Sequence, residues 1–175
     1  GYDLYLDLLQ RTVEDLKRKA ASGEEAPAEE EIDPEINLTL SAYIPERYIA
    51  DPDQRYVAYR KISAIAAPAE LDDMREELLD RYGQLPPETE NLLAVMELKL
   101  ELRALKIARL EQGASTLVFT FLDRTPVAPE KILILMKRSR DRVRLTPEGK
   151  LVVRADLPTP AAVVETAKKI LQAVR

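Results

Sequence analysis

Residues 75–87 read REELLDRYGQLPP, and this stretch predicts a helix, a glycine turn and the start of a second helix. Glycine is common where a helix ends, so Gly83 marks the expected end of the first helix. Pro86 and Pro87 then favour the first turn of the next one. The apolar side chains of the first helix, which begins at residue 71, recur at helical spacing and comprise Leu71, Met74, Leu78 and Leu79.

Two further helices are predicted on either side of this stretch. Residues 53–66 carry apolar side chains at three-residue steps, namely Tyr56, Tyr59, Ile62 and Ile65, so both tyrosines are expected to pack in the core. Pro68 marks the end of that helix. Residues 88–111 carry two adjacent apolar stripes and predict a long central buried helix that ends before Gly113.

The remaining elements predict a small sheet and two more helices. Residues 36–42 and 115–122 alternate apolar and polar side chains, and 143–145 and 151–154 flank the turn sequence TPEG as a hairpin. Residues 132–136 are apolar throughout, and the Pro129-Glu130 pair before them favours a helix. Thr159-Pro160 predicts the start of a terminal helix. The expected fold class is α+β, helix-rich, with a small mostly antiparallel sheet.

The N-terminal part has a different organisation. Residues 1–20 predict an amphipathic helix, and residues 21–35 form an acidic stretch without basic residues that is expected to be a flexible linker. Residues 36–175 are expected to form one compact domain. Because the chain begins Gly1-Tyr2 in a helical pattern, we expect a piece of a longer polypeptide whose helix Tyr2–Ala20 pairs with a second copy, without physiological meaning.

Composition argues against an independent enzyme. The 175 residues include neither Cys nor His, so thiolate nucleophiles, soft zinc ligands and the usual proton carrier near neutral pH are missing. We expect no cofactor. The formal net charge of −5 does not favour nonspecific contact with nucleic acid. No apolar stretch approaches the about 20 residues that a membrane span needs, so we expect a cytoplasmic protein without membrane contact.

Two clusters of charged residues are candidate functional sites. Glu77, Asp80 and Arg81 share one helical face beyond the apolar stripe, although periodicity alone favours an ordinary solvated face with a weak Glu77 to Arg81 pair. The densest basic cluster comprises Lys137, Arg138, Arg140, Arg142 and Arg144. It is either a solubilising loop and strand edge, which we favour, or an auxiliary contact with nucleic acid.

Residues 36–111 resemble the C-terminal domain of the bacterial transcription-repair coupling factors (Mfd). The resemblance rests on IPERYI at 44–49, on YRKI at 59–62 and on DRYG at 80–83, in this order after a strand. Residues 1–9, GYDLYLDLL, are similar to the end of the translocation module that these factors share with RecG-type helicases. Residues 1–20 would then be the end of the preceding translocase module.

The resemblance implies a non-catalytic, autoinhibitory domain. In that family the full-length protein is an ATP-dependent DNA translocase that removes stalled RNA polymerase and recruits UvrA for nucleotide-excision repair, with ATP, Mg²⁺, RNA polymerase and double-stranded DNA bound by other domains. The C-terminal domain docks on the UvrB-like N-terminal module of the same polypeptide and masks UvrA binding. Carried over to this sequence, the resemblance makes Glu77, Asp80 and Arg81 the clamp contacts, with Gly83 and Pro86 forming the structural turn.

Overall fold

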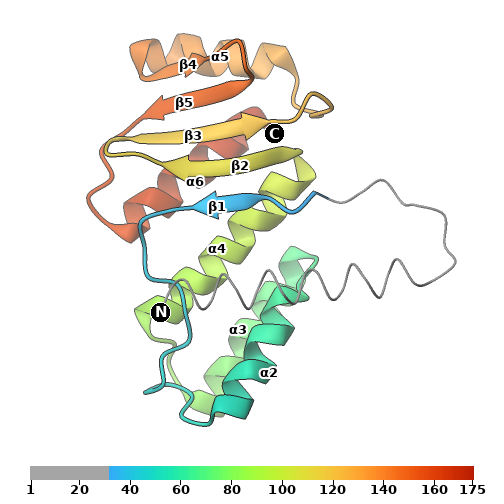
Figure 1. Cartoon of the computed structure of the whole chain (residues 1–175), viewed down its shortest axis with the longest axis vertical. Coiled ribbons are helices and arrows are strands. Elements are labelled where there is room, and N and C mark those ends of the chain that lie inside the picture. The colour runs from blue at the N-terminus through green and yellow to red at the C-terminus, as the bar shows by residue number, and fades with distance from the viewer. Residues whose placement is uncertain (1–31) are drawn as a thin grey trace, which may run out of the picture. The chain divides into compact units, whose positions relative to one another are not determined.

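The computed structural model describes residues 32–175, which form two compact units (Figure 1). Within the described part, one unit comprises residues 41–97 and the other comprises residues 32–40 and 98–175. The predicted helix at 1–20, its expected contact with a second copy and most of the acidic stretch lie outside the described residues. The boundary of residues 36–175 as one domain stays a prediction.

The first unit consists of helices joined by short connections. Its elements are α2 (Pro52–Ser63), α3 (Pro68–Tyr82) and the first part of α4 (Pro87–Ala104). All three begin with proline, as do α5 and α6 of the second unit, because proline suits the first turn, where no backbone N–H is needed. The side chain of Asp51 caps α2 by accepting a hydrogen bond from the Asp53 N–H at 2.9 Å.

Two residues predicted to lie in the core are exposed. Tyr56 is 49% exposed and Leu79 is 51% exposed. The buried side of α2 is formed by Ala58 and Ile62, so the three-residue spacing of the aromatic side chains assigned Tyr56 to the wrong face. On α3 the adjacent residue Leu78 takes the core position, which leaves Leu79 on the solvent side.

The second unit is built around a mixed sheet of five strands. They are β1 (Glu35–Asn37), β2 (Ile107–Gln112), β3 (Thr116–Phe121), β4 (Val143–Leu145) and β5 (Lys150–Arg154). Their order is β1-β2-β3-β5-β4, in which β1 pairs in parallel with β2 and the other neighbours are antiparallel. The structure confirms the predicted α+β class with its mostly antiparallel sheet.

The helix predicted to run to Glu111 ends earlier. Helix α4 stops at Ala104, Lys106 has a positive φ of 52°, and β2 follows directly. The apolar residues of this segment fit a strand as well as a helix, since the structure buries Leu105 and Ile107 just as the predicted helical stripe would require. Pairing with both β1 and β3 fixes the strand, because those partners satisfy its backbone hydrogen bonds.

The predicted strand at 36–42 is also shorter than expected. Only β1 pairs with a neighbour, although the burial of alternate residues continues to Ala42. Beyond β1 the backbone N–H of Thr39 donates to the side-chain oxygen of Gln112 at 2.8 Å, and not to a backbone carbonyl as in a strand pair. Asp33, inside the predicted linker, forms an ion pair of 2.8 Å with Lys99. Contacts of the second unit therefore already involve Asp33, which the sequence assigned to the linker.

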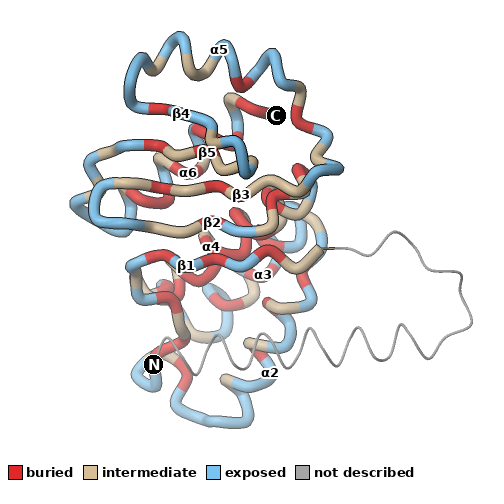
Figure 2. The backbone as a smooth tube through the Cα atoms, turned by 45° about the horizontal axis from the view of Figure 1, so that its top comes forward, coloured by how far each residue is buried: buried red, intermediate tan, exposed pale blue. Residues whose placement is uncertain are grey.

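The structure confirms the predicted hairpin and the two helices predicted in the C-terminal part of the chain. The hairpin of β4 and β5 turns at Gly149, which has a φ of 83°. Helix α5 (Pro129–Ser139) is followed by a 3-10 turn, η1 (Arg140–Arg142). The terminal helix is α6 (Pro160–Val174), and the Thr159 side chain caps it by accepting a hydrogen bond from the Ala162 N–H at 3.1 Å. Helix α6 covers one face of the sheet, while α5 is exposed over most of its length (Figures 1 and 2). None of the helices in residues 32–175 is long and apolar enough to cross a bilayer.

Candidate functional site

The last two turns of α3 carry a charged network that connects α3 with α2. Lys61 Nζ lies 2.6 Å from Glu77 Oε1, and Arg81 Nη1 lies 3.7 Å from the same oxygen. The Glu77 to Arg81 pair that helical spacing predicts is therefore present, but the shorter contact comes from α2. The side chain of Glu77 is 36% exposed, so water screens both pairs and each contributes little to stability.

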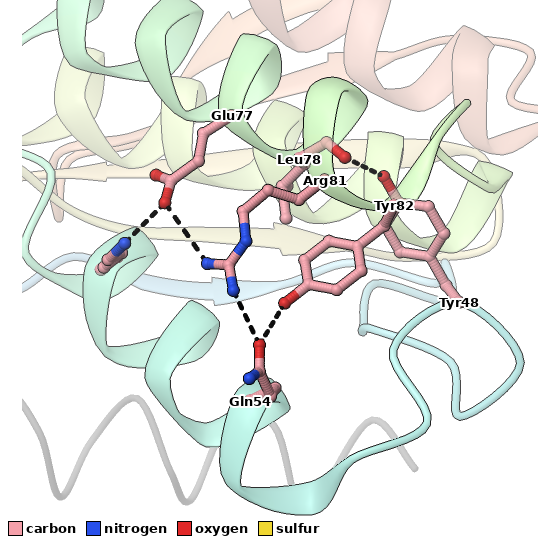
Figure 3. A network of polar contacts seen from close by, with 7 residues as sticks. Tyr48, Gln54, Glu77, Leu78, Arg81 and Tyr82 are labelled. Atoms are coloured by element: carbon pink, nitrogen blue, oxygen red, sulfur yellow. Dashed lines mark hydrogen bonds and ion pairs between the residues drawn. The ribbon is translucent and has the colours of Figure 1, made fainter.

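Gln54 at the start of α2 joins the same network (Figure 3). Its side-chain oxygen accepts hydrogen bonds from Arg81 Nη2 at 2.9 Å and from the Tyr82 hydroxyl at 2.6 Å. The Arg81 guanidinium also lies 5.2 Å from the centre of the Tyr82 ring, within the range of cation–π attraction. Arg81 is thus held by three partners at the protein surface, which reduces the conformational entropy that it would lose on binding.

Asp80 differs from its two neighbours. It is exposed, and among residues 32–175 no hydrogen bond or ion pair engages its side chain. The structure therefore brings Glu77 and Arg81 together and leaves Asp80 beside them as an unpaired negative charge. We call these three residues the α3 charge patch. Sequence spacing identified the patch but missed Lys61 and Gln54, because their contribution depends on how α2 packs against α3.

The turn after α3 has an unusual backbone conformation at Gly83. Its φ of 84° and ψ of −164° lie in a region that only glycine adopts readily, and not in the left-handed helical region that is common at helix ends. The Gly83 N–H still donates to the carbonyl of Leu79 at 3.0 Å. Pro86 accepts hydrogen bonds at its carbonyl from the next turn, and Pro87 begins α4.

The side chain of Tyr48 hydrogen-bonds to the backbone of this turn. Its hydroxyl lies 2.8 Å from the Gly83 carbonyl oxygen and 3.0 Å from that of Leu78, and Figure 3 shows it directed at the end of α3. The Tyr48 and Tyr82 rings pack edge to face with centres 5.8 Å apart. Burial raises the pKa of the Tyr48 hydroxyl above its usual value, and the charge of Glu90 adds to this effect. The hydroxyl thus stays protonated and able to donate.

The IPERYI segment and the residue after it are hydrogen-bonded to α2. The Ile44 N–H donates to the Tyr59 hydroxyl at 2.7 Å, and the Arg55 guanidinium donates to the carbonyl of Ile49 at 2.8 Å and to that of Ala50 at 3.0 Å. With Tyr48 bound at Gly83, the segment is attached to both α2 and α3. These motif residues therefore act as a scaffold that positions the α3 charge patch.

An ion pair fixes the same segment to the start of α4. Arg47 Nη2 lies 2.6 Å from Glu88 Oε2, and the Tyr43 N–H donates to the Glu88 carbonyl at 3.1 Å. The pKa of the Glu88 carboxyl lies below its usual value, first because it accepts a hydrogen bond from its own backbone N–H and then because of Arg47. Both interactions favour the ionised form.

The predicted basic cluster lies in the second unit, at the end of α5, in η1 and in β4. All of its members, Lys137, Arg138, Arg140, Arg142 and Arg144, are exposed. Within the described residues none of them forms an ion pair, and Asp141 lies among them in η1. A contact of this cluster with nucleic acid stays a prediction. The described residues hold no group of three or more side chains suited to bind a metal ion.

The signature residues described above belong to a known domain. The sequence profile of the TRCF domain matches residues 38–132, which include the scaffold, the α3 charge patch and β2. The chain belongs to the TRCF domain family. The curated relatives that this chain matches include bacterial transcription-repair-coupling factors, as the sequence resemblance indicated.

The relatives match most of this TRCF domain but are far longer. The factor from Myxococcus xanthus is 35% identical over 175 residues, which is 98% of this chain and 14% of the relative. That from Haemophilus influenzae is 33% identical and covers 79% of this chain with 12% of its own length. That from Escherichia coli is 27% identical and covers 98% with 15%. The chain thus spans only a small part of these relatives.

A solved structure shows the same fold. The crystal structure of the C-terminal domain of a transcription-repair coupling factor matches this TRCF domain with a TM-score of 0.72 and 21% identity. The match covers 82% of this chain and 92% of that one. The chain is therefore similar in fold to the C-terminal domain of such a factor.

Proposed function

We propose that this chain is a regulatory C-terminal domain that clamps the UvrB-like module of its own polypeptide and thereby masks the binding of UvrA. The parent protein would be a cytoplasmic ATP-driven DNA translocase that removes stalled RNA polymerase, with the nucleotide, polymerase and duplex DNA bound by other domains. Family membership supports the coarse assignment. The α3 charge patch supports the docking surface.

The observation that carries the proposal is the contrast between Asp80 and its neighbours. Glu77 and Arg81 are fixed by contacts with α2, whereas Asp80 has no partner among the described residues. A fixed pair beside an unpaired charge gives a surface with a defined register and one carboxylate still available for a cationic group. Charged contacts of this kind give specificity without large affinity, which suits a clamp that must open.

The chemistry of this surface also sets the expected affinity. Exposed ion pairs contribute only about 0–1 kcal/mol each, so the separated partners should bind weakly. In the intact polypeptide, the covalent connection raises the effective concentration and makes a weak contact sufficient. A clamp built in this way opens when another partner competes for the same module.

Calorimetric titration of the full chain into the separated UvrB-like module tests this proposal. We expect weak binding at about 0.1 M salt that is largely lost at about 1 M salt, since the Debye length falls from about 10 Å to about 3 Å. The Asp80→Lys variant should bind about tenfold more weakly at low salt, because the charge at this position is reversed. The Asp72→Lys variant is the matched control, because Asp72 is also exposed on α3, lies outside the patch and forms no ion pair with any residue of 32–175. The proposal fails if the chain shows no binding at low salt.

A further inference from the structure

A groove opens in the second unit between the two C-terminal helices. Its cavity volume is about 650 Å³, and its walls come from α5, η1, the paired strands β4 and β5, and α6. The groove is independent of the α3 charge patch, because all of its lining residues belong to the second unit.

The inner lining of the groove is apolar. Val143 and Val153 are each 4% exposed and are paired with each other in the sheet, so they form a fixed floor. Apolar side chains from the helices complete it, and they are Leu135 of α5 with Ile170 and Ala173 of α6. Among residues 32–175, no aromatic side chain lines the groove. An apolar side chain of a partner would find a preformed surface to bury against.

The polar lining of the groove is cationic. Four basic residues of the described part contribute to it, namely Arg138, Arg142, Arg154 and Lys169, and no aspartate or glutamate from residues 32–175 does. In the described part of the chain, none of the three arginines forms an ion pair with a carboxylate, whereas Lys169 lies 3.3 Å from the exposed Glu165. The guanidinium groups therefore keep their capacity to bind an anion, in a chain with a net charge of −5.

These two properties together define the chemistry of the partner. Arginine binds carboxylates in a bidentate geometry, and the apolar floor accepts an aliphatic side chain. We propose that this groove binds an acidic protein segment that inserts an apolar side chain between α5 and α6. Single-stranded nucleic acid fits less well, because its bases bind by stacking on aromatic side chains, and the described residues contribute none to the groove. Phosphates of a duplex would make no use of the apolar floor.

Fluorescence anisotropy with the full chain and a labelled peptide, Glu-Glu-Leu-Glu-Glu-Leu-Glu-Glu, tests the proposal. We expect saturable binding that weakens at least about tenfold in the variant Arg138→Glu/Arg142→Glu, because both rim charges are reversed. The variant Lys137→Glu/Arg144→Glu is the matched control. It changes the net charge equally at residues of the same cluster that do not line the groove, and it should retain the affinity.

Two more measurements test whether the apolar floor contributes to binding and whether the partner is a protein segment or a nucleic acid. Replacement of both leucines of the peptide by serine should weaken binding, and a single-stranded oligonucleotide of equal charge should compete poorly. The proposal is overturned if the chain does not bind the peptide, if the two double variants lose affinity equally, if the serine peptide binds as well, or if the oligonucleotide binds more tightly. Circular dichroism spectra that match those of the unchanged chain are required of both variants.

Discussion

The hydroxyl of Tyr48 lies 2.8 Å from the carbonyl oxygen of Gly83, and this contact ties the IPERYI segment to the turn that ends α3. The two residues are 35 positions apart in the chain. Because the same hydroxyl also lies 3.0 Å from the Leu78 carbonyl, it covers two backbone acceptors at the end of the helix. Tyr48 therefore helps to hold the helix end that carries Asp80 and Arg81.

The substitution Tyr48→Phe should lower the free energy of unfolding by about 1 kcal/mol. It removes the donor from two carbonyl groups and keeps the packing of the ring on Tyr82. Urea denaturation of the full chain measures the loss. The control is Tyr56→Phe, since Tyr56 is exposed and should change stability by less than about 0.5 kcal/mol. Equal stability of the two variants would contradict this role of Tyr48.

Substitution of Gly83 by alanine should lower stability through the backbone alone. A Cβ atom at this position meets nothing within 4 Å, so there is no steric clash with a neighbour. The conformation itself, with a φ of 84° and a ψ of −164°, costs a residue with a Cβ atom about 1–3 kcal/mol. Thermal or urea unfolding measures the difference. Gln84→Ala, at the adjacent exposed position, should change the stability little. If Gly83→Ala leaves the free energy of unfolding unchanged, the backbone conformation of Gly83 costs alanine nothing and this account of the turn is wrong.

The hydrogen bond that the Glu88 carboxylate accepts from its own backbone N–H, together with its ion pair with Arg47, should make stability depend on pH in the acid range. Because the folded-state pKa of Glu88 is below its ordinary value of 4.5, the stabilisation is fully present above that pH and is lost as the pH falls through the lower pKa. The Glu88→Gln variant should therefore be less stable than the unchanged chain at pH 7. Near pH 2 the difference should shrink, since the carboxyl is then protonated.

Urea unfolding at both pH values measures this difference. The variant Glu46→Gln is a suitable control, because Glu46 is exposed in the same segment and forms no ion pair among the described residues. A stability difference for Glu88→Gln that is the same at both pH values would show that the charge of Glu88 is not its cause.

The starts of α5 and α6 and the hairpin follow from the sequence because their signals are local. Proline at the first turn marked α5 and α6 in advance, and the turn sequence at 146–149 marked the hairpin. The prediction for Pro68 is wrong, since this residue begins α3 instead of marking the end of the helix at 53–66, and α2 already ends at Ser63. The boundary between α4 and β2 was not predictable in this way. Leu105 and Ile107 suit a buried face in either conformation, and the strand is decided by pairing with β3 and with β1, which lies far earlier in the sequence.

The candidate site was predictable only in part, for the same reason. Spacing along one helix predicts the Glu77 to Arg81 pair, which the structure contains. Lys61 and Gln54, which contact Glu77 and Arg81, come from α2. The hydrogen bond to the Gly83 carbonyl comes from Tyr48 in a loop, so neither set of contacts follows from periodicity within one helix. Tyr56 and Leu79 show the converse error, since apolar character at helical spacing did not determine which of two adjacent faces is buried.

The most direct test of the clamp is the affinity of the full-length protein for UvrA when Asp80 is changed to lysine. Asp80 has no contact to lose within the described residues, so the variant alters only the surface offered to the UvrB-like module. The clamp predicts tighter UvrA binding by about tenfold, which is about 1.4 kcal/mol, together with higher unstimulated ATPase activity. The Asp72→Lys control should behave like the unchanged protein. UvrA affinity that is the same in all three proteins would contradict the clamp.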